Sequence, residues 1–205
     1  MWWLWTAAML SLPTMFAGQY SRQRWYPLLK PLPLLLLISA VVQAPEFTGK
    51  TAVLLALAGG WLGDVALLFR RGFLPGLLAF LLGHLAMAVA LWQHGAGLNP
   101  WLIGLVLLVA LLMQRALRPP GRVLNLAVLV YGAVLGVVAV LAIPLSFQQA
   151  GAWPLALAAG LFVLSDSLLG WNKFRRPLPT AQLWILGSYF AAQCLFVYSF
   201  LTVMA

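Results

Sequence analysis

Long apolar segments separated by short connections dominate this chain of 205 residues. Hydrophobic residues make up 64% of the sequence and charged residues 7%, a composition outside the range of water-soluble globular domains. A helix that crosses a bilayer needs about 20 apolar residues, so each segment is long enough to span a membrane. Transmembrane helices are predicted at residues 2–18, 28–44, 51–69, 73–93, 100–117, 123–143, 152–170 and 179–203. We therefore expect an all-α, polytopic membrane helix bundle with eight transmembrane helices, in which residues 1–205 form a single transmembrane domain.

Positive charge alternates between successive connections. Of the 12 Lys and Arg residues, all but Lys50 follow the first, third, fifth or seventh predicted helix. Because cytoplasmic connections of membrane proteins carry the excess of Lys and Arg, both termini are predicted to be non-cytoplasmic. We expect an integral membrane protein of a bacterial inner (plasma) membrane. The net charge of +9 then reflects topology, so nucleic acid is not expected as a partner.

The third and seventh predicted helices resemble each other. Asp64 lies in GGWLGDVALLFRRGF and Asp166 in LFVLSDSLLGWNKFRR, each directly after a small residue. In the helices that follow, His84 and Tyr189 each lie 13 residues beyond the last base of the preceding connection. Predicted helices 1–4 and 5–8 are therefore a possible 4+4 parallel repeat, a construction known in membrane proteins.

Two of the three acidic residues, Asp64 and Asp166, lie inside predicted transmembrane helices. An aspartate at the centre of such a helix costs about 2.5–3.5 kcal/mol, so intramembrane carboxylates are candidate functional groups. Each lies about 10 Å from the base at the end of its helix, which puts both at one depth. If the two helices are neighbours, the carboxylates share a cavity that opens toward the cytoplasm. The alternative is that each carboxylate pairs with a nearby base as an ion pair at a helix end.

Further polar residues are predicted near this depth and together favour a hydrated pocket, although an interhelical hydrogen bond is the better explanation of any single one. They are Gln114, Asn125, Ser165, Ser167 and Asn172. His84 is predicted near the bilayer midplane, either at the inner end of the pocket or in a hydrogen bond between helices. The single Cys194 and the two histidines lack metal-ligand spacing, so no metal or cofactor is predicted.

Several short motifs occur along the chain. They are KPL at 30–32, GDVALL at 63–68, GH at 83–84, SDSLL at 165–169, and Tyr189 with Gln193. Their order resembles the YhhN family of lysoplasmalogenase-like membrane proteins. Some members of that family hydrolyse the vinyl ether bond of lysoplasmalogen to a fatty aldehyde and a glycerophospho-ethanolamine or -choline. The resemblance implies the same activity here, with a lysophospholipid as substrate and membrane lipids as surroundings. It also implies a set of site residues, which are Lys30, Asp64, His84, Ser165, Asp166, Tyr189 and Gln193.

Two carboxylates suit this reaction, because vinyl ether hydrolysis adds a proton to carbon and then water to an oxocarbenium ion. We expect Asp64, among glycines and apolar residues, to be the protonated general acid, and Asp166, between two hydroxyls, to be the ionised partner, while the reverse assignment stays open. His84 completes the expected catalytic set. The expected substrate-binding residues are Lys30, Ser165, Asn172, Tyr189 and Gln193. Bases near the mouth are expected to contact the phosphate, with Lys30, Arg70, Arg71 and Lys173 as candidates, although membrane topology alone also explains their positions.

A function of another class also fits the intramembrane carboxylates and the possible repeat. A small proton-coupled transporter or a lipid-binding membrane protein would show both features. The two classes differ in an observable way, because a hydrolase releases aldehyde in detergent whereas a transporter requires a sealed vesicle.

Overall fold

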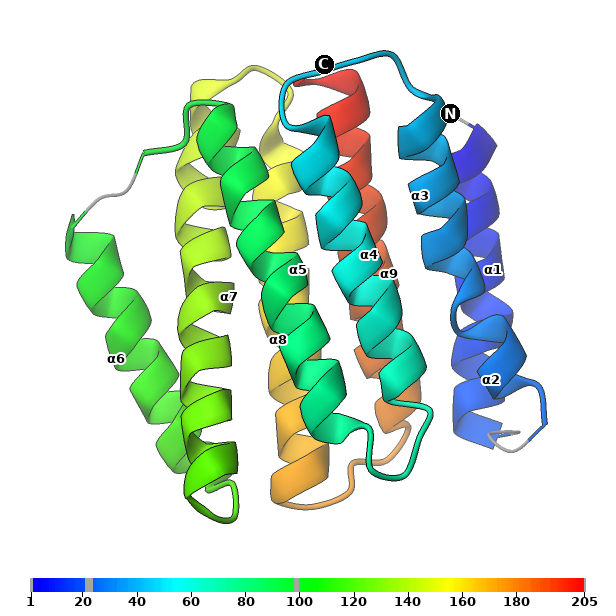
Figure 1. Cartoon of the computed structure of the whole chain (residues 1–205), viewed down its shortest axis with the longest axis vertical. Coiled ribbons are helices and arrows are strands. Elements are labelled where there is room, and N and C mark those ends of the chain that lie inside the picture. The colour runs from blue at the N-terminus through cyan, green and yellow to red at the C-terminus, as the bar shows by residue number, and fades with distance from the viewer. Residues whose placement is uncertain (1, 21–23, 98–99, 205) are drawn as a thin grey trace.

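The structure, a computed structural model, describes residues 2–20, 24–97 and 100–204. Within these ranges it is all-helical, and the helices stand side by side in a bundle (Figure 1). The helices are α1 (Trp2–Tyr20), α2 (Tyr26–Leu29), α3 (Leu32–Gln43), α4 (Lys50–Ala66), α5 (Phe73–Gln93), α6 (Pro100–Leu117), α7 (Arg122–Gln148), α8 (Trp153–Phe174) and α9 (Ala181–Thr202). Each predicted apolar segment corresponds to one helix, except that α2 and α3 together occupy the second.

The differences from the predicted boundaries have local causes. The second segment breaks at Lys30 and Pro31, because proline carries no N–H for the helical hydrogen-bond ladder. Helix α4 ends at Ala66 rather than at 69, and the chain turns sharply before α5. A Cβ on Gly72 would lie 1.7 Å from the Ala66 carbonyl oxygen, so this turn requires glycine. Helix α7 continues through Pro144 to Gln148, beyond the predicted end at 143.

Five helical segments of the described residues are long and apolar enough to cross a membrane. They are Tyr26–Gln43, Phe73–Gln93, Arg122–Gln148, Trp153–Phe174 and Ala181–Thr202. Large apolar side chains such as Leu55, Leu82 and Phe147 point away from the protein interior. Exposed apolar surface of this extent suits a hydrocarbon environment. The chain is therefore an integral membrane protein built from transmembrane helices.

The bundle has one strongly basic end. The start of α1 and the end of α9 lie at one end of the bundle, and the connections after α1, α4, α6 and α8 lie at the other (Figure 1). Exposed bases are found in these latter connections, including Arg70, Arg118 and Arg175. At the opposite end, Lys50 donates to Glu46 at 3.0 Å. The connections that are rich in Lys and Arg in the sequence therefore lie together at one end of the bundle.

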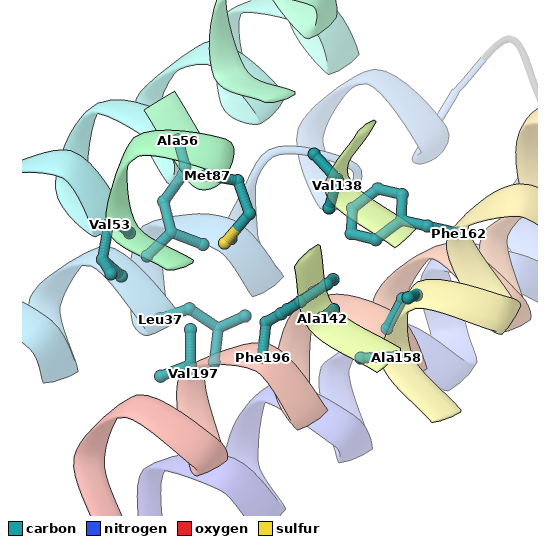
Figure 2. Packing of buried hydrophobic residues seen from close by; sticks show 14 of the residues in the cluster. Leu37, Val53, Ala56, Met87, Val138, Ala142, Ala158, Phe162, Phe196 and Val197 are labelled. Atoms are coloured by element: carbon teal, nitrogen blue, oxygen red, sulfur yellow. The ribbon is translucent and has the colours of Figure 1, made fainter. Parts of the chain in front are cut away.

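Close helix packing holds the interior together. Side chains from α3, α4, α5, α7, α8 and α9 meet in one buried cluster, part of which is shown in Figure 2. There the rings of Phe162 and Phe196 lie 5.7 Å apart. A Cβ on Gly59 would lie only 2.6 Å from Gly83 Cα, so α4 and α5 approach each other at backbone distance. Small residues at such crossings are a usual basis of helix association in membranes, where lipid competes for apolar contacts.

Candidate active site

Asp64 forms a buried ion pair with Lys30. Lys30 Nζ lies 3.2 Å from Asp64 Oδ1, and the two side chains are only 4% and 3% exposed. The break between α2 and α3 positions Lys30, while α4 carries Asp64. The structure therefore places Lys30 in the interior, whereas the sequence predicts a position near the mouth of the pocket. The mutual neutralisation of the two charges offsets much of the cost of burying each one.

Polar groups of α9 lie beside this ion pair. A Cβ on Gly60 would lie 2.9 Å from Tyr189 Oη and 3.0 Å from Gln193 Nε2, so the glycine leaves room for both side chains against α4. Tyr189 also interacts electrostatically with the Asp64 carboxyl. Within the described ranges, Tyr189 Oη and Asp64 Oδ2 have no hydrogen-bond partner of good geometry. Buried polar atoms of this kind are places where a water molecule or a substrate atom is needed.

Asp166 has a different partner. The Tyr131 hydroxyl, on α7, donates a 2.5 Å hydrogen bond to Asp166 Oδ2, on α8. Sequence reasoning missed Tyr131, because one tyrosine in an apolar helix gives no signal of its own. Tyr131 lies 35 residues before Asp166, much as Lys30 lies 34 residues before Asp64, but this similarity is visible only once the Lys30–Asp64 pair is known from the structure.

The Asp166–Tyr131 pair lies in the wall of a cavity of about 320 Å³. Side chains of α5, α6, α7 and α8 line this cavity, with Leu67 at the turn after α4. Among the described lining residues, only Tyr131, Asp166 and Ser167 carry polar side-chain atoms. A large apolar cavity with a few convergent polar groups is the usual form of a small-molecule site.

His84 is a buried residue of α5. Its Nδ1–H donates to the Phe80 carbonyl oxygen at 2.7 Å, which leaves Nε2 as the acceptor of a neutral ring. Nε2 is buried and has no partner among the described residues. The ring packs edge-on against Tyr131 at 5.5 Å and Phe162 at 5.0 Å. A small cavity of about 10 Å³, lined in part by His84 and Gln193, has room for about one water molecule.

The two carboxyls do not share one cavity, contrary to the expectation from their depth. Helix α4 packs against α3 and α5, whereas α8 packs mainly against α7 and α9. Asp166 lines the large cavity, while Asp64 is enclosed with Lys30 and lies outside its described lining. The two carboxyls are nevertheless close enough to interact electrostatically.

The remaining predicted polar residues make interhelical or loop contacts. Ser165 Oγ donates to the Ile185 carbonyl at 3.0 Å and links α8 to α9. Asn172 Oδ1 accepts from Leu178 N–H at 2.9 Å in the connection between these helices. Gln114 Nε2 donates to Asn125 Oδ1 at 2.9 Å and links α6 to α7. Among the described residues, no three His, Cys, Asp or Glu side chains are grouped as metal ligands.

Comparison with known proteins places this arrangement in a family. Human lysoplasmalogenase TMEM86B is 34% identical over 184 residues, covering 85% of this chain and 75% of the relative. The pig lysoplasmalogenase TMEM86B is 36% identical over 173 residues, covering 82% and 72% respectively. No solved structure matches the chain. Residues 25–200 match the family model of YhhN, which confirms the resemblance seen in the motifs: the chain belongs to the YhhN family.

Proposed function

We propose that this protein hydrolyses the vinyl ether bond of a 1-alkenyl lysophospholipid, releasing a fatty aldehyde and a glycerophospho-ethanolamine or -choline. One observation carries the proposal: the Asp166–Tyr131 pair is set in the wall of an otherwise apolar cavity. The reaction needs a proton donor beside a long hydrocarbon chain, and this cavity offers both. Membership of the YhhN family and similarity to proteins named lysoplasmalogenase support the choice of substrate.

The substrate is oriented by the polarity of the bundle. The alkenyl chain occupies the apolar cavity, and the phosphate points to the basic end. Lys173 is the base best placed for it, because Lys173 Nζ lies 5.2 Å from the ring centre of Phe73, which lines the cavity. A lysine there contacts phosphate as an exposed point charge. Lys30 cannot take this part, since it is buried against Asp64.

The chemistry runs through Asp166 as general acid and then general base. Asp166 gives its proton to the vinyl carbon attached to the alkyl chain, which leaves an oxocarbenium ion between the adjacent carbon and the ether oxygen. Water adds to that carbon and returns a proton to the Asp166 carboxylate. The resulting hemiacetal breaks into the aldehyde and the free glycerol hydroxyl. Tyr131 holds one carboxyl oxygen and leaves the other for the substrate.

Asp64 and His84 lie outside the described lining of the large cavity and have supporting roles. Asp64, neutralised in the ion pair with Lys30, is a structural group that takes no part in the proton transfer. This differs from the roles expected from the sequence, because Asp166 lines the cavity whereas Asp64 is enclosed. His84 Nε2 has no hydrogen-bond partner among the described residues, and His84 lines the small cavity. We assign it the role of positioning a water molecule there.

We also propose that both termini face away from the cytoplasm and that the chain arose by a 4+4 duplication. The charge separation supports the first point. Helix pairs support the second, since α1–α3, α3–α4 and α4–α5 each pack as α6–α7, α7–α8 and α8–α9 do. A cysteine at Ala150, between α7 and α8, is expected to react with an impermeant thiol reagent on intact cells. Reaction only after lysis would reverse the topology.

The test of function uses purified protein in detergent and D2O with a 1-alkenyl lysophosphoethanolamine. We expect aldehyde that carries one deuterium on carbon 2, because the proton is added to carbon. The matched 1-alkyl ether, which lacks the double bond, is expected to give no product. Absence of aldehyde in detergent, together with substrate movement across sealed vesicles, would support transport instead.

A further inference from the structure

The large cavity is elongated along α7. Its lining on this helix begins at Val128 near the basic end and continues to Pro144. At 1.5 Å per residue, these two positions are about 24 Å apart along the helix axis. Tyr131, which holds Asp166, lies close to the first of them. The cavity therefore continues on both sides of Asp166. Phe73, Leu117 and Phe174 bound the part toward the basic end, and residues of α7 as far as Pro144 bound the part beyond Asp166.

The part beyond Asp166 has the length of one long fatty chain. Tyr131 and Pro144 are about 20 Å apart along α7. An extended polypeptide gains at most about 3.6 Å for the three backbone bonds of each residue, and an extended hydrocarbon chain advances at a similar rate of about 1.2 Å per bond. The distance thus corresponds to about sixteen carbon atoms. The walls here are apolar and include Val106 of α6 with Ala139 and Ile143 of α7.

We propose that this part of the cavity binds one aliphatic chain and measures its length, with a limit of about sixteen carbons set between Asp166 and Pro144. The inference deepens the proposed function and rests on it for the identity of the chain. Ala139 and Ile143 determine the limit. Ala139 lies about 12 Å from Tyr131 along α7, so a larger side chain there would narrow the cavity. Ile143 lies near the end of the cavity at Pro144.

Three variants test the limit. Ala139→Phe fills the cavity after about ten carbons, and Ile143→Ala opens its far end. Ala133→Phe is the matched control, because it adds the same ring to the same helix at a position outside the described cavity lining. Aldehyde release is measured with 1-alkenyl lysophosphoethanolamines of ten to eighteen carbons. Binding is measured separately, as the rise in unfolding temperature with non-hydrolysable 1-alkyl ethers of the same lengths.

In the wild type, each added CH2 is expected to raise kcat/KM up to about fourfold until about sixteen carbons, after which the gain stops. Ala139→Phe is expected to lower kcat/KM for sixteen carbons by at least about tenfold while retaining ten-carbon substrates. Ala133→Phe is expected to keep the wild-type profile, and Ile143→Ala is expected to extend the limit.

The outcomes separate the inference from the proposed function. If ether lipids stabilise the protein with a limit that Ala139→Phe shortens, the chain site stands even when no aldehyde forms, and the proposed function fails. If aldehyde forms but Ala139→Phe keeps the wild-type profile in both measurements, the inference is overturned and the function stands. Should Ala139→Phe fail to fold, an unchanged limit in Ile143→Ala overturns the inference.

Discussion

The two intramembrane carboxyls occupy comparable positions but different surroundings. Each is held by a side chain from the preceding transmembrane segment, Lys30 for Asp64 and Tyr131 for Asp166. The first pair is an ion pair closed off from its surroundings, and the second lines a cavity of about 320 Å³. A cation neutralises the enclosed carboxylate, whereas a phenol holds the cavity carboxyl without neutralising it. We infer that the first is a structural pair and that the second provides the proton.

The contacts of α1 and α6 explain where the cavity forms. Helix α1 packs closely against α9 and α3. Helix α6 packs mainly against α7 and only slightly against α8. The space left between α5, α6, α7 and α8 is the cavity. The loosely packed helix is therefore the one that borders the cavity.

The largest effect on stability is expected at the enclosed ion pair. Lys30→Met leaves the Asp64 carboxylate buried without its partner and should lower the free energy of unfolding by about 3–5 kcal/mol. Lys173→Met, at the exposed basic end, should lower it by at most about 1 kcal/mol. Denaturant unfolding in detergent measures both. The double variant Lys30→Met/Asp64→Leu should recover stability, and failure to recover would show that the lost charge pair is not the cause.

A smaller loss is expected at the α4–α5 crossing. Gly59→Ala places a methyl group against the Gly83 backbone and should lower the free energy of unfolding by about 1–3 kcal/mol. Gly160→Ala on α8 is the control, because a Cβ on Gly160 would have no described atom of a neighbouring element within 4 Å. Equal stability of the two variants in the same unfolding measurement would contradict the close packing of α4 on α5.

The smallest effect compares the two tyrosines. Tyr131→Phe removes the hydrogen bond to Asp166 and should lower kcat/KM by about tenfold, equivalent to about 1.4 kcal/mol. Tyr189→Phe should change kcat/KM by less than about threefold, since the Tyr189 hydroxyl has no well-formed hydrogen bond to lose within the described ranges. Initial rates of aldehyde release measure both. A larger loss for Tyr189→Phe would make the Asp64 side the reacting one.

The sequence predicts the parts of this architecture that have a simple physical signal. Apolar length predicts the helices, and the cost of a carboxylate in lipid singles out Asp64 and Asp166. The orientation of Lys30 has no such signal, because a lysine in KPLP resembles other bases between helices. The inward orientation of the Lys30 side chain depends on the break between α2 and α3 at Lys30 and Pro31. Tyr131 also has no recognisable signal in the sequence, because its contact with Asp166 depends on which helices become neighbours.

The most direct test of the account is aldehyde release by Asp166→Asn in detergent, measured beside its unfolding temperature. Asparagine can still accept the hydrogen bond from Tyr131 but cannot give a proton to carbon. We predict that kcat falls by about 10²–10⁴-fold while the unfolding temperature stays close to that of the wild type. Wild-type turnover by Asp166→Asn would contradict the assignment of Asp166 as the acid in the cavity.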